Sequence, residues 1–483
     1  MSFVREFIKK VWESWSTRIG IIFLAILIIL SILVVLTYPI DFGRRIWSNP
    51  SHWADNPRLA PPIWASFFTR AKIPTHTVLK LNQPTNILGG ENLTLMEYSV
   101  EINYGYDDYP SFLHVSIKNV TFYSTKPPRI EVWVSRPDNL IVRLTSFTIR
   151  GPSPIEEPPY RRYVESPYRI ILTEDLTSIL NLIYSLNEKY SSNITLDEVS
   201  TIGSEKLFFG YPSKLGEKGF SILKGPYRLH AKVYIYGGLG SVGEVDFILG
   251  GKTYGLLGTD IIGRDLMMGL LYGFPASLMI GFLASTLVTS IGTLLGVLSG
   301  YIGGRTDTVI QRSSDLVLNM PLLPILIFFT FIFREFGMRF LLIILVLTAF
   351  SWPGLTIIIR PMVMQIKSSQ FIEAAISCGA SRRWVMRKHI LPNLAPFVIA
   401  QSIFLIPSAI LAEAALSFLG LGDPTLPTWG QILEQGFRSG AIYLGYWWWV
   451  IPPGILIVFT AITFLLITIG LEPILNPKLK SVI

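Results

Sequence analysis

Residues 370–393 spell QFIEAAISCGASRRWVMRKHILPN and lie between two long apolar runs of the chain. Gln370–Ser377 is built from helix-compatible residues, and Gly379 interrupts the pattern. Ser381 is a suitable N-cap for a second short helix over residues 382–388. Glycine permits a sharp turn that would cost another residue about 1 kcal/mol. The stretch therefore predicts a helix–turn–helix knob that fits into the groove of a partner protein.

The chain around this stretch is unusually apolar, because 50% of its residues are hydrophobic and only 15% are charged. A bilayer core of about 30 Å needs about 20 apolar residues in helical form. The chain contains six such runs, at 19–38, 276–301, 316–333, 340–359, 394–419 and 447–471. They predict an α-helical polytopic membrane protein with six spans. The tryptophans at 447–449 are typical of an aromatic belt at the membrane interface.

The basic residues are distributed unevenly around these runs. With the N-terminus placed in the cytoplasm, 14 Lys and Arg residues fall in inner segments and 3 in the two short outer loops. Cytoplasmic loops of membrane proteins carry such an excess of basic residues. The sequence therefore predicts a multi-pass protein of the plasma membrane with both termini in the cytoplasm. It also places the 370–393 stretch on the cytoplasmic side.

Residues 41–255, between the first two runs, have a different composition. They hold 23 Lys and Arg and 21 Asp and Glu residues, and no long apolar run. Stretches 113–122, 130–134 and 227–236 alternate as half-buried strands do, and 174–190 has the pattern of an amphipathic helix. We expect an extracellular, mainly β domain inserted between spans 1 and 2. Its many aromatic residues are more often core residues than ligand-stacking ones.

Composition argues against several other classes of protein. The single cysteine, Cys378, permits no disulfide within the chain and no thiolate metal site, and we expect it to be a small packing residue. The five histidines are scattered without a metal-binding pair, so no metal site is predicted. Basic residues at membrane margins account for the net charge of +8, so no nucleic-acid partner is needed.

The cytoplasmic stretch resembles a family motif. Glu373-Ala374-Ala375, Gly379 and Leu391-Pro392 stand at the spacing typical of permease subunits of ATP-binding-cassette (ABC) importers. His389 departs from the isoleucine of the general motif, but the run His-Ile-Leu-Pro-Asn at 389–393 is similar to the dipeptide, oligopeptide and nickel branch. Further marks of that branch stand at 258–265, 352–354 and 413–422. The chain resembles the C-type permease subunit of the branch.

The resemblance implies a type I importer fold and a set of partners. These are a second, homologous permease, two cytoplasmic ATPase subunits, an extracellular substrate-binding protein and the lipid bilayer. ATP and Mg would be bound in the ATPase subunits, and this chain would hold no cofactor and catalyse no reaction. The chain would divide into residues 1–40 (N-terminus and first span), 41–255 (insertion) and 256–483 (permease core). A coupling loop at about 367–392 would contact the ATPases.

The residues that the resemblance assigns to coupling are Glu373, Ala374, Ala375, Gly379, Ala380, Ser381, Arg382, Arg383, His389, Leu391 and Pro392. Four further residues, Glu413, Ser417, Trp352 and Pro353, are candidates either for the translocation path or for packing within the helix bundle. An acid within a span is costly and often functional, but it can also hold helices in register. Both interpretations of Glu413 stay open at this point.

Three functions remain open from the sequence. The first is uptake of oligopeptides, or of oligosaccharides or nickel, through an ABC importer. The second is export by a permease of the same family. The third is a membrane-anchored extracellular protein for adhesion or glycan binding, which would need no ATPase. The family's segment between the first two spans is usually far shorter than residues 41–255, so the resemblance leaves the role of the insertion open.

Overall fold

A computed structural model describes residues 14–39, 41–90, 92–213, 219–332 and 339–475. The chain forms two compact units. The membrane unit contains the residues up to Asn49 and those from Leu266 onward, and the second unit is Pro50–Asp265. Several basic residues counted for the topology, namely Arg5, Lys9, Lys10, Arg334, Lys478 and Lys480, lie outside the described residues.

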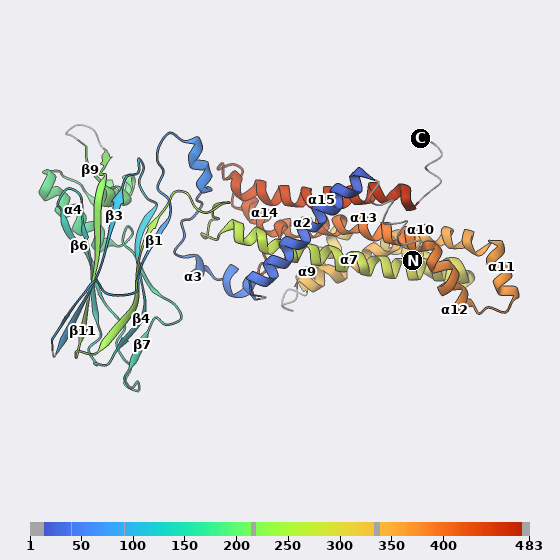
Figure 1. Ribbon diagram of the computed structural model, residues 1–483, viewed down its shortest axis with the longest axis horizontal. Coiled ribbons are helices and arrows are strands. Elements are labelled where there is room, and N and C mark those ends of the chain that lie inside the picture. Colours follow the sequence, from blue (N-terminus) through green and yellow to red (C-terminus); the bar gives the residue numbers. More distant parts are fainter. Residues whose placement is uncertain (1–13, 40, 91, 214–218, 333–338, 476–483) are drawn as a thin grey trace. The chain divides into compact units, whose positions relative to one another are not determined.

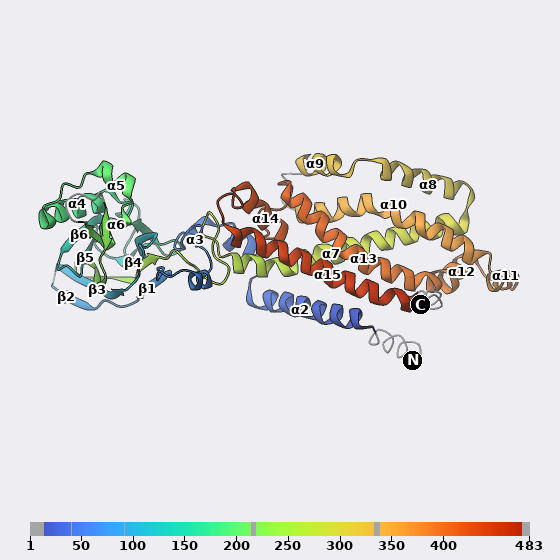
Figure 2. The same cartoon turned by 90° about the horizontal axis from the view of Figure 1, so that it is seen from above.

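The described part of the membrane unit is helical (Figures 1 and 2). Its elements are α2 (Trp15–Thr37), η1 (Gly43–Trp47), α7 (Leu266–Ile302), α8 (Gly304–Asn319), α9 (Leu322–Ile332), α10 (Arg339–Lys367), α11 (Gln370–Ser377), α12 (Arg382–Val385), η3 (Met386–Ile390), α13 (Leu391–Phe418), α14 (Trp429–Arg438) and α15 (Trp447–Leu475). The long helices α7, α10, α13 and α15 run side by side, and α2 packs against α15 and α7.

Five helices of the described chain are long and apolar enough to cross a membrane. They are Trp15–Thr37, Leu266–Ile302, Leu341–Lys367, Arg382–Phe418 and Trp447–Leu471. The run predicted at 316–333 is divided between the end of α8 and α9, with Pro321 between them. Phe333 lies outside the described residues. Proline removes a backbone donor and interrupts a helix. Because neither α8 nor α9 is among the five candidate spans, the sixth span stays a prediction.

A row of glycines lets α7 pack closely against α10. Gly292, Gly296 and Gly300 lie on one face of α7 and meet α10 directly. A Cβ atom added at Gly296 would lie 2.8 Å from the Cβ of Ile359. Glycines at this four-residue spacing let two helix backbones approach within a membrane. The hydroxyl of Thr356 on α10 also donates to the Gly292 carbonyl at 3.1 Å, which adds a hydrogen bond to the packing of the two helices.

The tryptophans at 447–449 do not form a simple lipid-facing belt. Trp447 is 38% exposed, whereas Trp449 is only 1% exposed and contacts Gly436 of α14. The prediction of an interfacial belt is wrong for Trp449, because the short helix α14 packs over it. Local sequence does not reveal this contact.

The second unit is a β-sandwich with α4, α5 and α6 gathered on one side (Figure 2). One sheet has the order β1-β12-β4-β7, with β8 also paired to β4, and the other has the order β2-β3-β11-β5-β6. The strands are β1 (Thr77–Leu81), β2 (Asn86–Gly89), β3 (Leu93–Tyr104), β4 (Phe112–Phe122), β5 (Arg129–Ser135), β6 (Ile141–Thr148), β7 (Tyr160–Arg162), β8 (Tyr168–Ile171), β9 (Gly210–Pro212), β10 (Phe220–Ile222), β11 (Gly225–Tyr236) and β12 (Gly240–Gly250). The helices are α3 (Pro50–Trp53), η2 (Ile63–Phe68), α4 (Leu176–Tyr190), α5 (Leu196–Ile202) and α6 (Glu205–Phe209).

The core of this unit lies between the two sheets. In β4, which pairs antiparallel with β12, Val115 lies opposite Phe247 and Ile117 opposite Val245, and all four side chains are buried. The fully buried rings include Tyr98, Tyr104, Phe122, Tyr227 and Phe247. The predicted strands at 113–122, 130–134 and 227–236, the helix at 174–190 and the use of these aromatic rings for packing are confirmed.

Candidate functional site

Loop 367–392 folds as two short helices joined by a tight turn. α11 ends at Ser377, and Gly379 follows with a φ of +87°, in the left-handed region that favours glycine. The Gly379 and Ala380 amides donate to the carbonyls of Ile376 and Ala375 at 2.9 and 3.1 Å. Ser381 caps α12 by accepting a hydrogen bond from the Trp384 amide at 3.3 Å. The helix–turn–helix and the Ser381 cap are as predicted from the sequence.

Three apolar side chains attach this loop to the helix bundle. Ile372, Val385 and Ile390 are fully buried, in one cluster with Val363 of α10 and Tyr301 of α7. Burying a side chain of this size contributes about 1.5–3 kcal/mol. The loop is therefore a packed extension of α7 and α10. A movement of the loop has to move those helices with it.

The loop also exposes large apolar side chains. Phe371, Ile376 and Trp384 are each 47–48% exposed. Trp384 also forms an edge-on ring contact with His389, at 5.0 Å between ring centroids. Such side chains in water mark a site for another protein when they are clustered. We call Phe371, Ile376 and Trp384 the apolar ridge.

Most of the predicted coupling residues are exposed in the structure. The exposed ones are Glu373, Ala374, Gly379, Ser381, Arg382, Arg383, Leu391 and Pro392, whereas Ala375, Ala380 and His389 are half-buried. Cys378 is exposed, so its interpretation as a packing residue is wrong. The apolar ridge was missed from the sequence, although aromatic residues among basic ones were a visible signal.

An ion pair beside the loop was also missed. Arg360 of α10 donates two hydrogen bonds to the Asp307 carboxylate of α8, both at 2.6 Å. The same carboxylate accepts from the Ser299 hydroxyl of α7. The hydrogen bond from Arg360 holds the pKa of Asp307 below its ordinary value. Because three helices meet at this carboxylate, it fixes the end of the bundle from which the loop projects.

Glu413 lies in a different part of the membrane unit. Its side chain is buried at 2% exposure near the end of α13, and it accepts hydrogen bonds from the hydroxyls of Ser417 and Thr428 at 2.6 and 2.8 Å. Thr428 is also the N-cap of α14. Glu413 and Ser417 therefore hold α14 against α13, which favours the packing interpretation over direct contact with a transported molecule.

Trp352 lies at the contact of α10 with α7, and Pro353 is its neighbour in α10. The Trp352 carbonyl lies 3.0 Å from a Cβ added at Gly292 and accepts the Thr356 hydroxyl at 3.1 Å. Pro353 is buried within α10. Among the described residues, no hydrogen bond joins this pair to Glu413 or Ser417. The four candidates thus belong to two separate packing contacts.

Two variants distinguish the interpretations of Glu413. If Glu413 serves packing, only Glu413→Ala should be harmful, whereas a role for its charge would make Glu413→Gln harmful as well. Glu413→Ala should destabilise the α13–α14 contact by about 2 kcal/mol or more, because two buried hydroxyl donors lose their acceptor. Glu413→Gln keeps the accepting oxygen and should retain both stability and transport. Hydrogen exchange of α14 and uptake assays on both variants measure these effects. Lost transport in a stable Glu413→Gln variant would show that the charge itself is needed.

Comparisons with known proteins assign part of the membrane unit to a family. Residues 292–481 match the family model of the binding-protein-dependent transport system inner membrane component. The oligopeptide transport system permease protein OppC of Haemophilus influenzae is 34% identical over 228 residues, which cover 47% of this chain and 71% of the relative. The dipeptide transport system permease protein DppC of Bacillus subtilis is 34% identical over 224 residues, with 46% and 68% covered.

Among solved structures, the MetNI methionine ABC transporter in an inward-facing conformation matches with a TM-score of 0.36 and 21% identity. That match covers 44% of this chain and 96% of the other. Each of these relatives therefore corresponds to less than half of this chain.

Proposed function

Because the chain belongs to the dipeptide and oligopeptide family of ABC importer permeases, we propose that it forms half of an ATP-driven translocation path for oligopeptides. A second homologous permease supplies the other half, and an extracellular binding protein delivers the substrate. Two cytoplasmic ATPase subunits drive the transport cycle. Both chain termini are cytoplasmic, and the unit Pro50–Asp265 lies outside the cell.

Loop 367–392 is the element that couples ATP hydrolysis to transport. The observation that carries this assignment is that the loop packs against the bundle and also leaves large apolar side chains exposed. Ile372, Val385 and Ile390 are buried against the bundle, while the apolar ridge and Glu373 stay exposed. A groove of an ATPase subunit would cover the ridge. Since α7 and α10 pack closely through glycines, closure of the ATPases would move them as rigid bodies.

The test is uptake by the reconstituted complex. This chain, its partner permease and the ATPases are placed in vesicles with ATP inside, and the binding protein is added outside with labelled oligopeptides. We expect peptide accumulation that stops when the ATPase cannot hydrolyse ATP. Labelled oligosaccharides and Ni²⁺ serve as competing substrates.

Each alternative predicts a different result in this system. Uptake of oligosaccharides or Ni²⁺ but not of peptides would overturn the substrate class. ATP-dependent efflux would make the chain an export permease. Failure of any ATPase to co-purify with this chain would favour the membrane-anchored adhesion protein.

A further inference from the structure

The unit Pro50–Asp265 has an exposed apolar patch that its own core does not use. It comprises residues of η2 and of the segment that leads to α7: Ile63, Trp64, Phe67, Phe68, Leu256, Ile261 and Ile262. Phe67 and Phe68 are 83% and 85% exposed, and Leu256 is 64% exposed. Single exposed apolar residues are ordinary, but a contiguous patch marks a surface that binds another apolar surface. We call these seven residues the basal patch.

Hydrogen bonds between two segments of the chain hold the backbone of the basal patch in place. The Ile63 amide donates to the Gly255 carbonyl at 3.0 Å, and the Trp64 indole donates to the Leu256 carbonyl at 2.8 Å. Between the same two segments, the buried Thr259 hydroxyl donates to the Pro57 carbonyl at 2.7 Å. These bonds join segments that are about 200 residues apart in the chain. The exposed rings are therefore held outward in a defined arrangement.

Exposed basic side chains border the patch. Residues 56–90 contain no Asp or Glu, while Arg58, Arg70 and Lys72 are all exposed. The nearby acids are partly compensated. Asp107 accepts a hydrogen bond from the Lys72 amide and pairs with Lys224, and Asp260 is buried and paired with Arg264. Asp265 is half-buried beside Gly255. Aromatic and aliphatic side chains bordered by Arg and Lys are the composition of a surface that lies in the headgroup layer of a membrane. Such cations attract anionic phospholipids.

The chain itself brings this patch close to a bilayer. Ile262 stands four residues before Leu266, the first residue of the candidate span α7, so the connection reaches about 14 Å at most when fully extended. α7 contains 37 residues and is therefore about 55 Å long. Its length exceeds the roughly 40–45 Å of a bilayer with its headgroups. The start of α7 thus stands in or just above the headgroup layer.

We propose that the basal patch inserts into the headgroup–acyl boundary of the bilayer that the helices cross, with Phe67 and Phe68 deepest and Arg58, Arg70 and Lys72 on phosphates. The occupant is the phospholipid surface. This anchor ties the large outer unit to the membrane at a second place besides its chain connections. The proposal rests only on the chain's being a membrane protein and does not depend on which substrate is transported.

The test measures the depth of a spin label. In a Cys378→Ser background of the full chain, Phe67→Cys and, as a matched control, Ile155→Cys are labelled and placed in phospholipid nanodiscs. Ile155 is 94% exposed on the same unit, so neither substitution removes a core residue. We expect the label at position 67 to collide with lipid-dissolved oxygen and to be shielded from a water-soluble nickel complex. The label at 155 should show the reverse.

Two further comparisons decide between lipid and protein. A label at 67 that is as accessible to nickel as the label at 155 in nanodiscs of this chain alone would overturn the proposal. If shielding then appears only when the partner permease or the binding protein is added, the patch is a protein interface. Anionic lipid should deepen the label at 67, and Arg70→Gln with Lys72→Gln should remove that effect. Equal depth in anionic and zwitterionic discs would overturn the role of the basic margin.

Discussion

Gly379→Val is expected to reduce ATP-driven uptake by about tenfold or more while the chain still inserts in the membrane. Gly379 has a φ of +87°, and a β-branched residue held in that region carries strain of about 1–3 kcal/mol. A Cβ atom at this position meets nothing within 4 Å, so the loss arises from the backbone and not from a clash. The turn would relax toward another conformation and change the angle between α11 and α12.

Uptake and ATP hydrolysis, measured together in reconstituted vesicles, check this prediction. We expect hydrolysis that the binding protein no longer stimulates, because Glu373 and Trp384 no longer form one surface. Gly379→Asn is the matched control, since asparagine adopts left-handed conformations at low cost and should keep most of the activity. Full uptake by the Val variant would contradict the coupling role of the turn.

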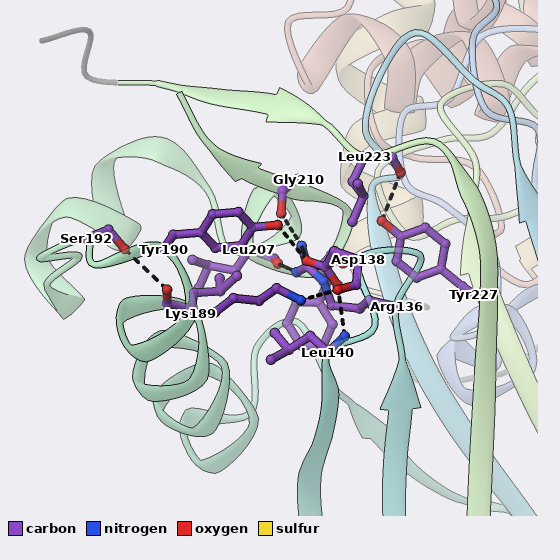
Figure 3. Close-up of polar contacts among 12 residues, drawn as sticks. Arg136, Asp138, Leu140, Lys189, Tyr190, Ser192, Leu207, Gly210, Leu223 and Tyr227 are labelled. Atoms are coloured by element: carbon purple, nitrogen blue, oxygen red, sulfur yellow. Dashed lines mark hydrogen bonds and ion pairs between the residues drawn. The ribbon is translucent and has the colours of Figure 1, made fainter. Parts of the chain in front are cut away.

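Arg136→Ala should destabilise the second unit strongly, by about 3–5 kcal/mol. The Arg136 side chain is fully buried and forms an ion pair of 3.3 Å with Asp138 (Figure 3). It also donates hydrogen bonds to the carbonyls of Leu207 and Gly210, at the end of α6. Removing the guanidinium takes the ion-pair partner from Asp138, which keeps hydrogen bonds from the Tyr190 hydroxyl and the Leu140 amide. It also leaves the two carbonyls without this donor, which is costly.

The matched control is an exposed arginine of the same unit. Arg228 pairs with Glu101 at 2.7 Å, and the two side chains are 56% and 53% exposed. An exposed pair contributes about 0–1 kcal/mol, so Arg228→Ala should hardly change stability. Hydrogen exchange of the full chain is the measurement, and we expect α6 and β9 to lose protection in Arg136→Ala only. Equal effects of the two variants would show that burial does not determine how much Arg136 contributes to stability.

Much of the fold could be predicted from local patterns. The apolar runs located five helices that are long enough to cross a membrane, and period-2 alternation located β4, β5 and β11. These patterns are visible because each element buries one face, whatever partner covers that face. The run at 316–333 was harder, since Pro321 separates α8 from α9 and composition alone does not show where a helix breaks.

The candidate site, too, could be predicted from the sequence only in part. Spacing and turn chemistry predicted the α11–turn–α12 loop, including the Ser381 cap and the glycine turn. Neither the Arg360–Asp307 pair nor the Glu413–Thr428 bond was predicted, because each joins residues of different helices. Cys378 was misjudged for a related reason, since its exposure depends on which face of α11 the bundle covers.

The sequence by itself determined that loop 367–392 bends at Gly379 and that helices of spanning length flank it. Those features follow from backbone preference and hydrophobic periodicity, which act within a few residues along the chain. Only the tertiary structure decided which side of the loop is free. Burial of Ile372, Val385 and Ile390 against α7 and α10 turns Phe371, Ile376 and Trp384 outward. Local sequence does not show which apolar residues of the loop are buried, because their burial depends on contacts with helices that are distant in the chain.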